Sequence, residues 1–285
     1  MDEIANSDMS EFWNGRGGHK WVHNQNRIDK SLAKFGRKAM SAAPIAMNNS
    51  VLDIGCGCGD TSFEIASRVG SLGHVQGIDI SKTVLDYAQQ KKHSNAHKNI
   101  KFECADVQTH DFKPNEFQVA FSRFGVMFFD DPVKAFSNIR KAITPDGMLA
   151  FICWQPVNVN QWVNLPLEVV SNYVALPPAQ DSNDPGAFSL GDRKRVIYVL
   201  DSAGYSKTSI QQLHTSLNVG ANLEEAVTFL TQIGPSSSIV ESTDIGDDTR
   251  SRIKEDLRDA LVPYITEQGV ELGAATWIVT ASNNN

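Results

Sequence analysis

Short apolar runs alternate with amphipathic segments along the first half of the chain. Apolar runs bounded by turn residues are typical of buried strands, whereas apolar positions spaced by three or four residues are typical of helices. The pattern predicts strands at 51–54, 74–80, 100–104, 117–122 and 148–154, and helices at 61–69, 82–92 and 133–142. Strands that alternate with helices predict an α/β protein with a largely parallel sheet.

The alternation is interrupted on both sides of this region. Residues 1–45 are polar with spaced apolar positions, which predicts N-terminal helices. The alternation of strand and helix breaks after 154, in a stretch that holds Trp162, Pro166, Tyr173 and Pro177-Pro178, which predicts an insertion over 155–205. A polar strand at 207–219, helices at 223–233 and 247–264, and a strand at 274–280 follow. We therefore predict an N-terminal helical segment over 1–45 and one α/β domain over 46–285, with 155–205 inserted within it.

A glycine-rich turn follows the first predicted strand, with the sequence Gly55-Cys56-Gly57-Cys58-Gly59-Asp60. Its glycines permit positive φ angles and close backbone approach to a ligand, and a helix begins directly after it. Asp60 occupies the place of the third glycine of a dinucleotide fingerprint, and no lysine follows as it would in a triphosphate-binding loop. An acidic neighbour favours a ligand with an ammonium or sulfonium charge. The alternative is a βα turn that binds nothing.

Composition and charge narrow the function further. The 285 residues are 41% hydrophobic and carry a formal charge of −7. The negative charge argues against electrostatic binding to nucleic acid or to an anionic membrane. The chain has no run of 18 apolar residues and no signal pattern at its start. Its four cysteines are expected to be buried free thiols. We therefore expect a cytoplasmic protein without a metal site or a stable membrane insertion, and leave its oligomeric state open.

Two stretches resemble a known family. Val51-Leu52-Asp53-Ile54-Gly55-Cys56-Gly57-Cys58-Gly59 resembles motif I of the class I S-adenosylmethionine (SAM)-dependent methyltransferases. The string S-R-F-G-V-M-F-F-D-D-P at 122–132 resembles the methyltransferases related to the ubiquinone and menaquinone C-methylating enzymes. The resemblance implies a Rossmann-like sheet of seven strands, mostly parallel, with an antiparallel last strand, helices on both faces and an N-terminal helical lid. Simple packing of the N-terminal helices on the domain is the alternative to a lid.

The resemblance also implies roles for residues that end the predicted strands. Asp79 would accept the ribose hydroxyls, Ile80 would lie on the adenine, and Asp106 with Val107 would bind the adenine edge. The alternatives are a helix cap for Asp79 and a purely local turn for Asp106. The full set expected at the cofactor is Trp21, Asp53, Gly55, Cys56, Gly57, Asp60, Asp79, Ile80, Asp106, Val107, Ser122 and Arg123.

The predicted activity is the in-line transfer of a methyl group from SAM to a small organic acceptor. Aromatic residues from three regions are expected at the acceptor, namely Trp13, Phe124, Trp154 and Trp162. His19 and His23 are the nearest candidates for a general base, with ordinary surface histidines as the alternative. Two other functions stay open: a catalytically idle SAM-binding regulator or partner protein, and a divergent NAD-dependent oxidoreductase.

Overall fold

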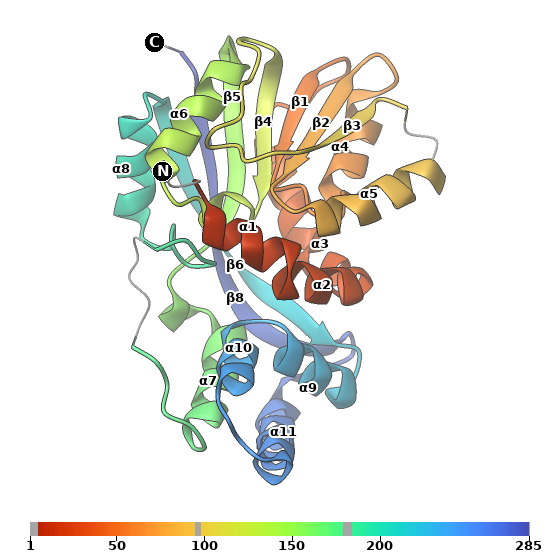
Figure 1. The fold of residues 1–285 in the computed structure, drawn as a ribbon, viewed down its shortest axis with the longest axis vertical. Helices are drawn as coiled ribbons and strands as arrows, with labels where there is room; N and C mark the ends of the chain where they lie inside the picture. The colour runs from red at the N-terminus through yellow and green to blue at the C-terminus, as the bar shows by residue number, and fades with distance from the viewer. Residues whose placement is uncertain (1–4, 95–97, 179–183, 285) are drawn as a thin grey trace.

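The computed structural model describes residues 5–94, 98–178 and 184–284, and its centre is one mixed sheet (Figure 1). The strand order is β3-β2-β1-β4-β5-β8-β6, and the short β7 pairs with β8. Strands β1 to β5 are parallel, whereas β8 is antiparallel to both β5 and β6. This topology confirms the predicted Rossmann-like sheet with its antiparallel last strand. The strands are β1 (Ser50–Ile54), β2 (His74–Asp79), β3 (Ile100–Cys104), β4 (Phe117–Arg123), β5 (Ile143–Trp154), β6 (Ser206–Gly220), β7 (Ile265–Thr266) and β8 (Gly269–Ser282).

Helices connect the strands and cover both faces of the sheet. Apolar side chains from β1, β4 and β5 are fully buried beneath them, among them Leu52, Phe121 and Phe151. Helix α8 packs against α6 and β6, so the second part of the predicted insertion belongs to the cover of the sheet. The connecting helices are α4 (Asp60–Val69), α5 (Lys82–Ser94), α6 (Pro132–Ala142) and α8 (Arg193–Ser202).

The N-terminal helices differ in how deeply they pack. Helix α3 (Gln25–Ala42) buries Ile28, Leu32 and Phe35 along one stripe and contacts β4, β5, β6 and β8. Helix α1 (Ser7–Asn14) buries no residue, and α2 (Arg16–His23) buries only its two glycines. Figure 1 shows α1 and α2 lying across the region where the parallel strands end. Helix α3 is therefore part of the core, whereas α1 and α2 are a thin outer cover.

A second group of helices gathers below the sheet in Figure 1. It consists of α7 (Gln161–Ser171) from the predicted insertion, and α9 (Leu223–Gln232), α10 (Pro235–Ser242) and α11 (Asp247–Leu261) from the connection between β6 and β8. Helix α10 was not predicted, because Gly234 and Pro235 are typical of a turn. Here Gly234 has a φ of 100°, and Pro235 starts the helix, where its missing N–H costs nothing.

Some details depart from the sequence expectations. Strand β5 begins at Ile143 rather than at 148, so residues 144–147 belong to an extended segment. Cys56, Cys58 and Cys153 are buried free thiols as predicted, but Cys104 is exposed because it ends β3, which lies at the edge of the sheet. Residues 1–4 and 179–183 of the predicted lid and insertion lie outside the described residues. Within the described ranges, no helix is long and apolar enough to cross a membrane.

Candidate functional site

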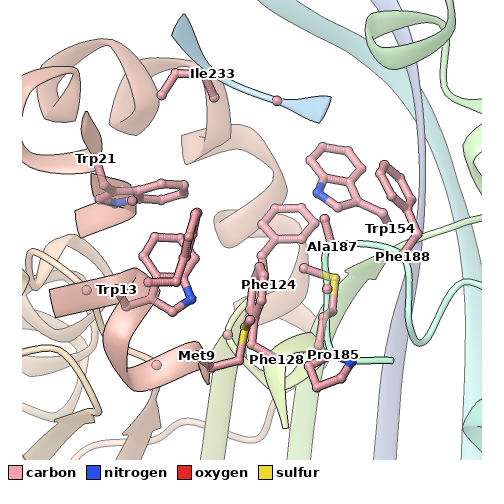
Figure 2. A pocket seen from close by; sticks show the side chains of 18 of the residues that line it. Met9, Trp13, Trp21, Phe124, Phe128, Trp154, Pro185, Ala187, Phe188 and Ile233 are labelled. Atoms are coloured by element: carbon pink, nitrogen blue, oxygen red, sulfur yellow. The ribbon is translucent and has the colours of Figure 1, made fainter. Parts of the chain in front are cut away.

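A cavity of about 880 Å³ opens at the carboxyl ends of β1, β2, β4 and β5. This is the place where open α/β sheets bind their ligands. One end of the cavity is formed by the glycine turn and by acidic residues that end β2 and follow β3. The other end is formed by aromatic side chains from the loop after β4, the end of β5 and the helices below the sheet, and Trp13 and Trp21 of α1 and α2 also line the cavity (Figure 2). Its volume lies at the upper end of the range of small-molecule pockets.

The glycine turn forms the floor of the polar end. Gly55 and Gly57 have φ angles of 61° and 54°, which side chains rarely adopt. A Cβ on Gly55 would lie 2.7 Å from Cα of Gly125, so this glycine lets the loops after β1 and β4 touch. A Cβ on Gly57 would meet only Nε1 of Trp21, at 3.7 Å, because it would project into the cavity. Gly55 is therefore needed for the packing of the two loops, whereas Gly57 keeps the cavity free of a side chain.

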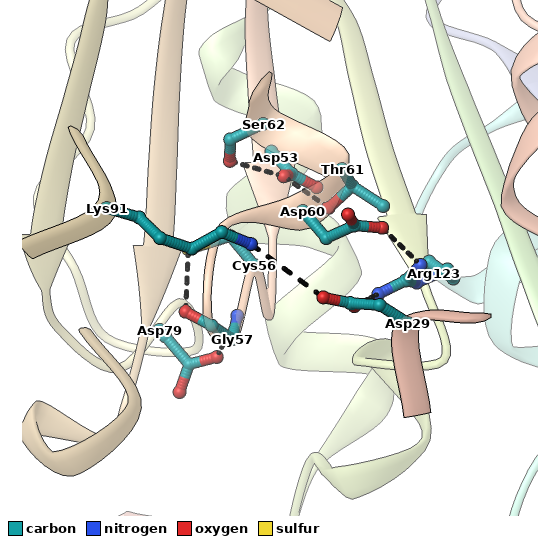
Figure 3. Close-up of polar contacts among 10 residues, drawn as sticks. All are labelled: Asp29, Asp53, Cys56, Gly57, Asp60, Thr61, Ser62, Asp79, Lys91 and Arg123. Atoms are coloured by element: carbon teal, nitrogen blue, oxygen red, sulfur yellow. Dashed lines mark hydrogen bonds and ion pairs between the residues drawn. The ribbon is translucent and has the colours of Figure 1, made fainter. Parts of the chain in front are cut away.

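Asp79 joins this turn to the start of α5 (Figure 3). Its Oδ2 accepts a hydrogen bond of 2.9 Å from the Gly57 N–H, and its Oδ1 accepts one of 2.9 Å from the Ser81 N–H. Desolvation raises the pKa of Asp79 above 3.8, although the backbone N–H groups act in the opposite direction. Ser81 itself accepts from the Val84 N–H at 3.3 Å and caps α5. Asp79 lines the cavity with both oxygens held in place.

Two residues predicted at the cofactor lie beneath the cavity and do not line it. Asp53 is fully buried, and its Oδ2 accepts from the Thr61 hydroxyl at 2.7 Å and the Ser62 hydroxyl at 2.5 Å. Desolvation raises the pKa of Asp53 from 3.8 to about 6. The Ser122 hydroxyl donates to the Ile54 carbonyl at 2.8 Å and accepts from the Gly125 N–H at 3.2 Å. Both side chains fix the loops that form the floor.

Arg123 brings a buried positive charge to the cavity wall, and two carboxylates balance it. Its guanidinium lies 2.9 Å from Oδ2 of Asp60 and 3.2 Å from Oδ1 of Asp29, as Figure 3 shows. Desolvation and the neighbouring Asp60 raise the pKa of Asp29, whereas Arg123 lowers it. Asp60 does not line the cavity and is an ion-pair partner of Arg123. The sequence pattern did not indicate Asp29, because an acidic residue within an amphipathic helix carries no site signal.

Asp106 and its neighbours form another part of the cavity wall. Oδ1 of Asp106 accepts from Nδ2 of Asn6 at 2.8 Å and from the Gln108 N–H at 2.9 Å. Oδ2 of Asp106 is buried and has no hydrogen-bond partner among the described residues. Ile80 and Val107 also line the cavity here. Asn6 was not predicted at the site, because a single asparagine in a polar N-terminal stretch is not a motif.

Aromatic rings line the other end of the cavity. Phe124 stacks on Trp154 with ring centroids 4.3 Å apart, and Trp154 lies 4.9 Å from Trp162. Trp13 meets Trp21 edge-on at 5.6 Å and Phe128 at 5.2 Å (Figure 2). The structure thus places the four predicted acceptor residues, Trp13, Phe124, Trp154 and Trp162, around one space with Trp21.

Two of these rings have unusual features. Phe124 has a φ of 63°, which is strained for a bulky residue and marks a position that the surrounding loop enforces. The Nε1 atom of Trp162 is buried without a hydrogen-bond partner in the described part of the chain. The Trp277 indole, which is also buried, donates to the Gly191 carbonyl at 2.6 Å. An unsatisfied N–H is therefore a property of Trp162 and not of this region as a whole.

Segments that no motif indicated complete the cavity. Phe229 and Ile233 at the end of α9 and Ile239 of α10 line it from below. Glu241 of α10 forms ion pairs with Lys20 and Arg16 of α2. The cover therefore joins helices that are more than 200 residues apart in the chain. Apolar residues beside a Gly-Pro pair were the signal available, but they are equally typical of a helix in the core.

The two predicted general-base candidates do not line the cavity. His19 and His23 are both exposed, and Nδ1 of His19 lies 2.7 Å from the Gly15 carbonyl oxygen. The described residues contain no group of three or more histidine, cysteine and acidic residues arranged to hold a metal ion.

Comparison with known proteins finds methyltransferases. Residues 45–173 match the family model described as a methyltransferase domain. A 2-phytyl-1,4-naphtoquinone methyltransferase of Nostoc is 27% identical over 69% of this chain and 80% of its own length. The aklanonic acid methyltransferase DauC of Streptomyces is 31% identical over 41% of this chain and 53% of its own length. Phosphoethanolamine N-methyltransferase 2 of Haemonchus contortus, solved with SAM, has the same fold, with a TM-score of 0.53, 16% identity, and 88% of this chain and 53% of that one covered.

Proposed function

Because the chain is a class I SAM-dependent methyltransferase with relatives among the quinone methyltransferases, we propose that it methylates a flat, apolar small molecule. One observation carries this proposal. A single cavity joins a polar end, formed by the glycine turn and two carboxylates, to an aromatic end formed by Phe124, Trp154 and Trp162. A donor bound at the first end and an acceptor bound at the second would meet inside the same closed space.

The polar end has the groups that SAM requires. Each oxygen of Asp79 takes one backbone N–H and has a lone pair left for a ribose hydroxyl. The unpartnered Oδ2 of Asp106 would accept from the adenine amine, and Gly57 leaves its backbone open to the cavity. An unsatisfied buried carboxylate oxygen costs free energy that a ligand donor would return. These atoms support the predicted ribose and adenine roles.

The aromatic end supports a flat acceptor with a polar oxygen. Parallel rings such as Phe124 and Trp154, 4.3 Å apart, present a flat wall against which another ring can pack. The unpartnered N–H of Trp162 would donate to an oxygen of the acceptor. A naphthoquinone, the substrate named for the Nostoc relative, is a flat ring system of this kind. A small charged acceptor such as phosphoethanolamine would lose its hydration here without adequate compensation.

The chain would act mainly by positioning the two ligands and excluding water. Bound SAM supplies an electrophilic methyl group for in-line displacement. Trp13, Trp21 and Phe128 would close the cavity over the reacting atoms, since all three line it and Trp13 contacts both of the other rings edge-on. Holding two reactants in a productive geometry can contribute on the order of 7–11 kcal/mol to catalysis. The helices α1 and α2 would therefore serve as a lid, and residues 155–178 and 184–191 with α9 and α10 as the acceptor cover.

Separate incubations with two different acceptors test the proposal. The protein is incubated with methyl-labelled SAM and either 2-naphthol or phosphoethanolamine, and the products are identified by mass spectrometry. We expect label in the naphthol and none in the phosphoethanolamine, and the reverse result would refute the flat apolar acceptor. Trp162→Phe, which keeps a ring but removes the N–H, should lower kcat/KM for the naphthol by roughly tenfold. Its affinity for S-adenosylhomocysteine (SAH) should stay that of the wild type.

A further inference from the structure

The side chain of Asn6 connects three parts of the chain at the polar end of the cavity. Its Nδ2 donates to Oδ1 of Asp106 at 2.8 Å, and Oε1 of Gln108 lies 3.4 Å away. Its Oδ1 accepts from the Asp130 N–H at 2.5 Å. Asn6 is 5% exposed and lines the cavity. The N-terminal segment is thus fastened to the loop after β3 and to the loop after β4 through one amide.

The backbone of Asn6 fits this position independently of its side chain. Its φ of 53° lies in the left-handed region, which asparagine and glycine adopt most readily. Asn6 precedes α1, and its carbonyl accepts the first helical bond, from the Ser10 N–H at 2.8 Å. The side chain makes no capping bond to the helix. The amide is therefore used for contacts across the cavity wall and not for starting the helix.

These contacts divide the two oxygens of Asp106 between different partners. Oδ1 is occupied by Asn6 and by the Gln108 N–H, which leaves Oδ2 as the oxygen without a partner among the described residues. We propose that Asn6 is a specificity-determining residue for the cofactor, because it fixes Asp106 in the orientation that accepts from the adenine amine. The inference rests on the proposed adenine role of Asp106. It adds that the lid itself helps to recognise the base.

A second asparagine at the other end of α1 supplies a matched control. Oδ1 of Asn14 accepts from the Lys82 N–H at 2.8 Å, and its Nδ2 donates to the Ile80 carbonyl at 3.2 Å. The Asn14 carbonyl accepts from the Thr83 hydroxyl at 2.8 Å. Asn14 thus fastens α1 to the start of α5 without touching Asp106. Loss of the Asn14 side chain should weaken the contact between α1 and α5. It should therefore weaken ligand binding by the same factor whichever nucleoside base the ligand carries.

Adenine and hypoxanthine distinguish the two roles chemically. The amine of adenine donates a hydrogen bond, whereas hypoxanthine carries a carbonyl oxygen at the same position, which a carboxylate repels. The dissociation constants of SAH and S-inosylhomocysteine are measured by calorimetry for the wild type, Asn6→Gly and Asn14→Ala. Glycine at position 6 keeps the positive φ, and circular dichroism checks that each variant is folded.

We expect the wild type to prefer SAH over the inosyl analogue, and Asn6→Gly to lower this preference by roughly tenfold. Asn14→Ala should weaken both ligands by a similar factor and keep the preference. An unchanged preference in Asn6→Gly would refute the role of Asn6. Equal binding of the two ligands by the wild type would instead refute the proposed adenine role of Asp106, and with it the role of Asn6. No SAH binding at all would contradict the proposed SAM site itself.

Discussion

The two ends of the cavity are built in opposite ways. The polar end comes from short loops that directly follow β1, β2, β3 and β4, and its side chains are held by hydrogen bonds to backbone N–H groups. The aromatic end comes from segments far apart in the chain, and its side chains hold one another by ring contacts. The first end is fixed by the sheet, whereas the second combines two rings at the ends of β4 and β5 with rings from helices that pack separately.

This difference suggests how one fold can serve many acceptors. At the polar end a ligand would meet carboxylates that are fixed by hydrogen bonds, so that end would suit one cofactor and tolerate little change. Rings at the aromatic end can be exchanged for others of similar size without disturbing the sheet. The relatives described above are all named as methyltransferases, but for different acceptors. Variants that change one end should therefore leave the binding properties of the other end unaltered.

The largest effect is expected from Gly57→Val, which acts on the polar end alone. A branched side chain would project into the cavity from a backbone with a φ of 54°, so it should strain the turn and block the cofactor. We expect SAH affinity to fall by roughly a hundredfold or more, which corresponds to at least about 2.8 kcal/mol. Calorimetry with SAH measures this, and binding of 2-naphthol should persist.

Gly246→Val is the matched control, because Gly246 has a φ of −66° and no atom lies within 4 Å of its added Cβ. Its SAH affinity should equal that of the wild type. Near-normal SAH binding by Gly57→Val would mean that the cofactor does not pass over this turn. Together with Trp162→Phe, which should affect only the acceptor, this pair separates the two ends of the cavity.

A smaller effect, on the pH dependence of stability, is expected from Asp53, the buried carboxylate beneath the polar end. The pKa of Asp53 is raised from 3.8 to about 6 by desolvation, so the folded state prefers its protonated form. Its contribution to stability is therefore full below about pH 3.8 and is lost as the pH rises through about 6. Between pH 5 and pH 7 the loss should be about 1 kcal/mol of unfolding free energy.

Urea unfolding of the wild type and Asp53→Asn at these two pH values measures the effect. The variant cannot titrate at this position, so its unfolding free energy should fall by about 1 kcal/mol less than that of the wild type. Other groups titrate in both proteins and cancel in the difference. Equal changes would show that Asp53 is not the source of the pH dependence. Trp162→Phe should follow the wild type, because no titrating group is altered.

Much of the polar end could be predicted from sequence, because its signals are local. Gly55 and Gly57 lie in the turn after β1, Asp79 ends β2, and parallel strands end at one edge of the sheet. The same logic could not separate Asp79, which lines the cavity, from Asp53, which lies beneath it, since a strand pattern does not give the depth of a carboxylate. Asp29 and Asn6 were missed because their partners are about 100 residues away.

The aromatic end was predicted only in part. Trp13, Phe124, Trp154 and Trp162 were expected to converge and do so, because their segments border the carboxyl edge of the sheet. The contribution of α9 and α10 could not be predicted, since it follows from how the connection between β6 and β8 packs under the cavity. The division of the N-terminal segment into a buried α3 and an outer α1 and α2 is likewise a result of packing.

Hydrogen exchange with two ligand additions tests most directly whether the cavity has two independent ends. SAH alone should protect the backbone of 55–60, 79–81 and 105–108 and leave 154–162 and 229–239 unchanged. Further addition of 2-naphthol should protect 154–162 and 229–239 and add little to the first set. Protection of the aromatic segments by SAH alone, or of the glycine turn by naphthol alone, would contradict the assignment of cofactor and acceptor to separate ends.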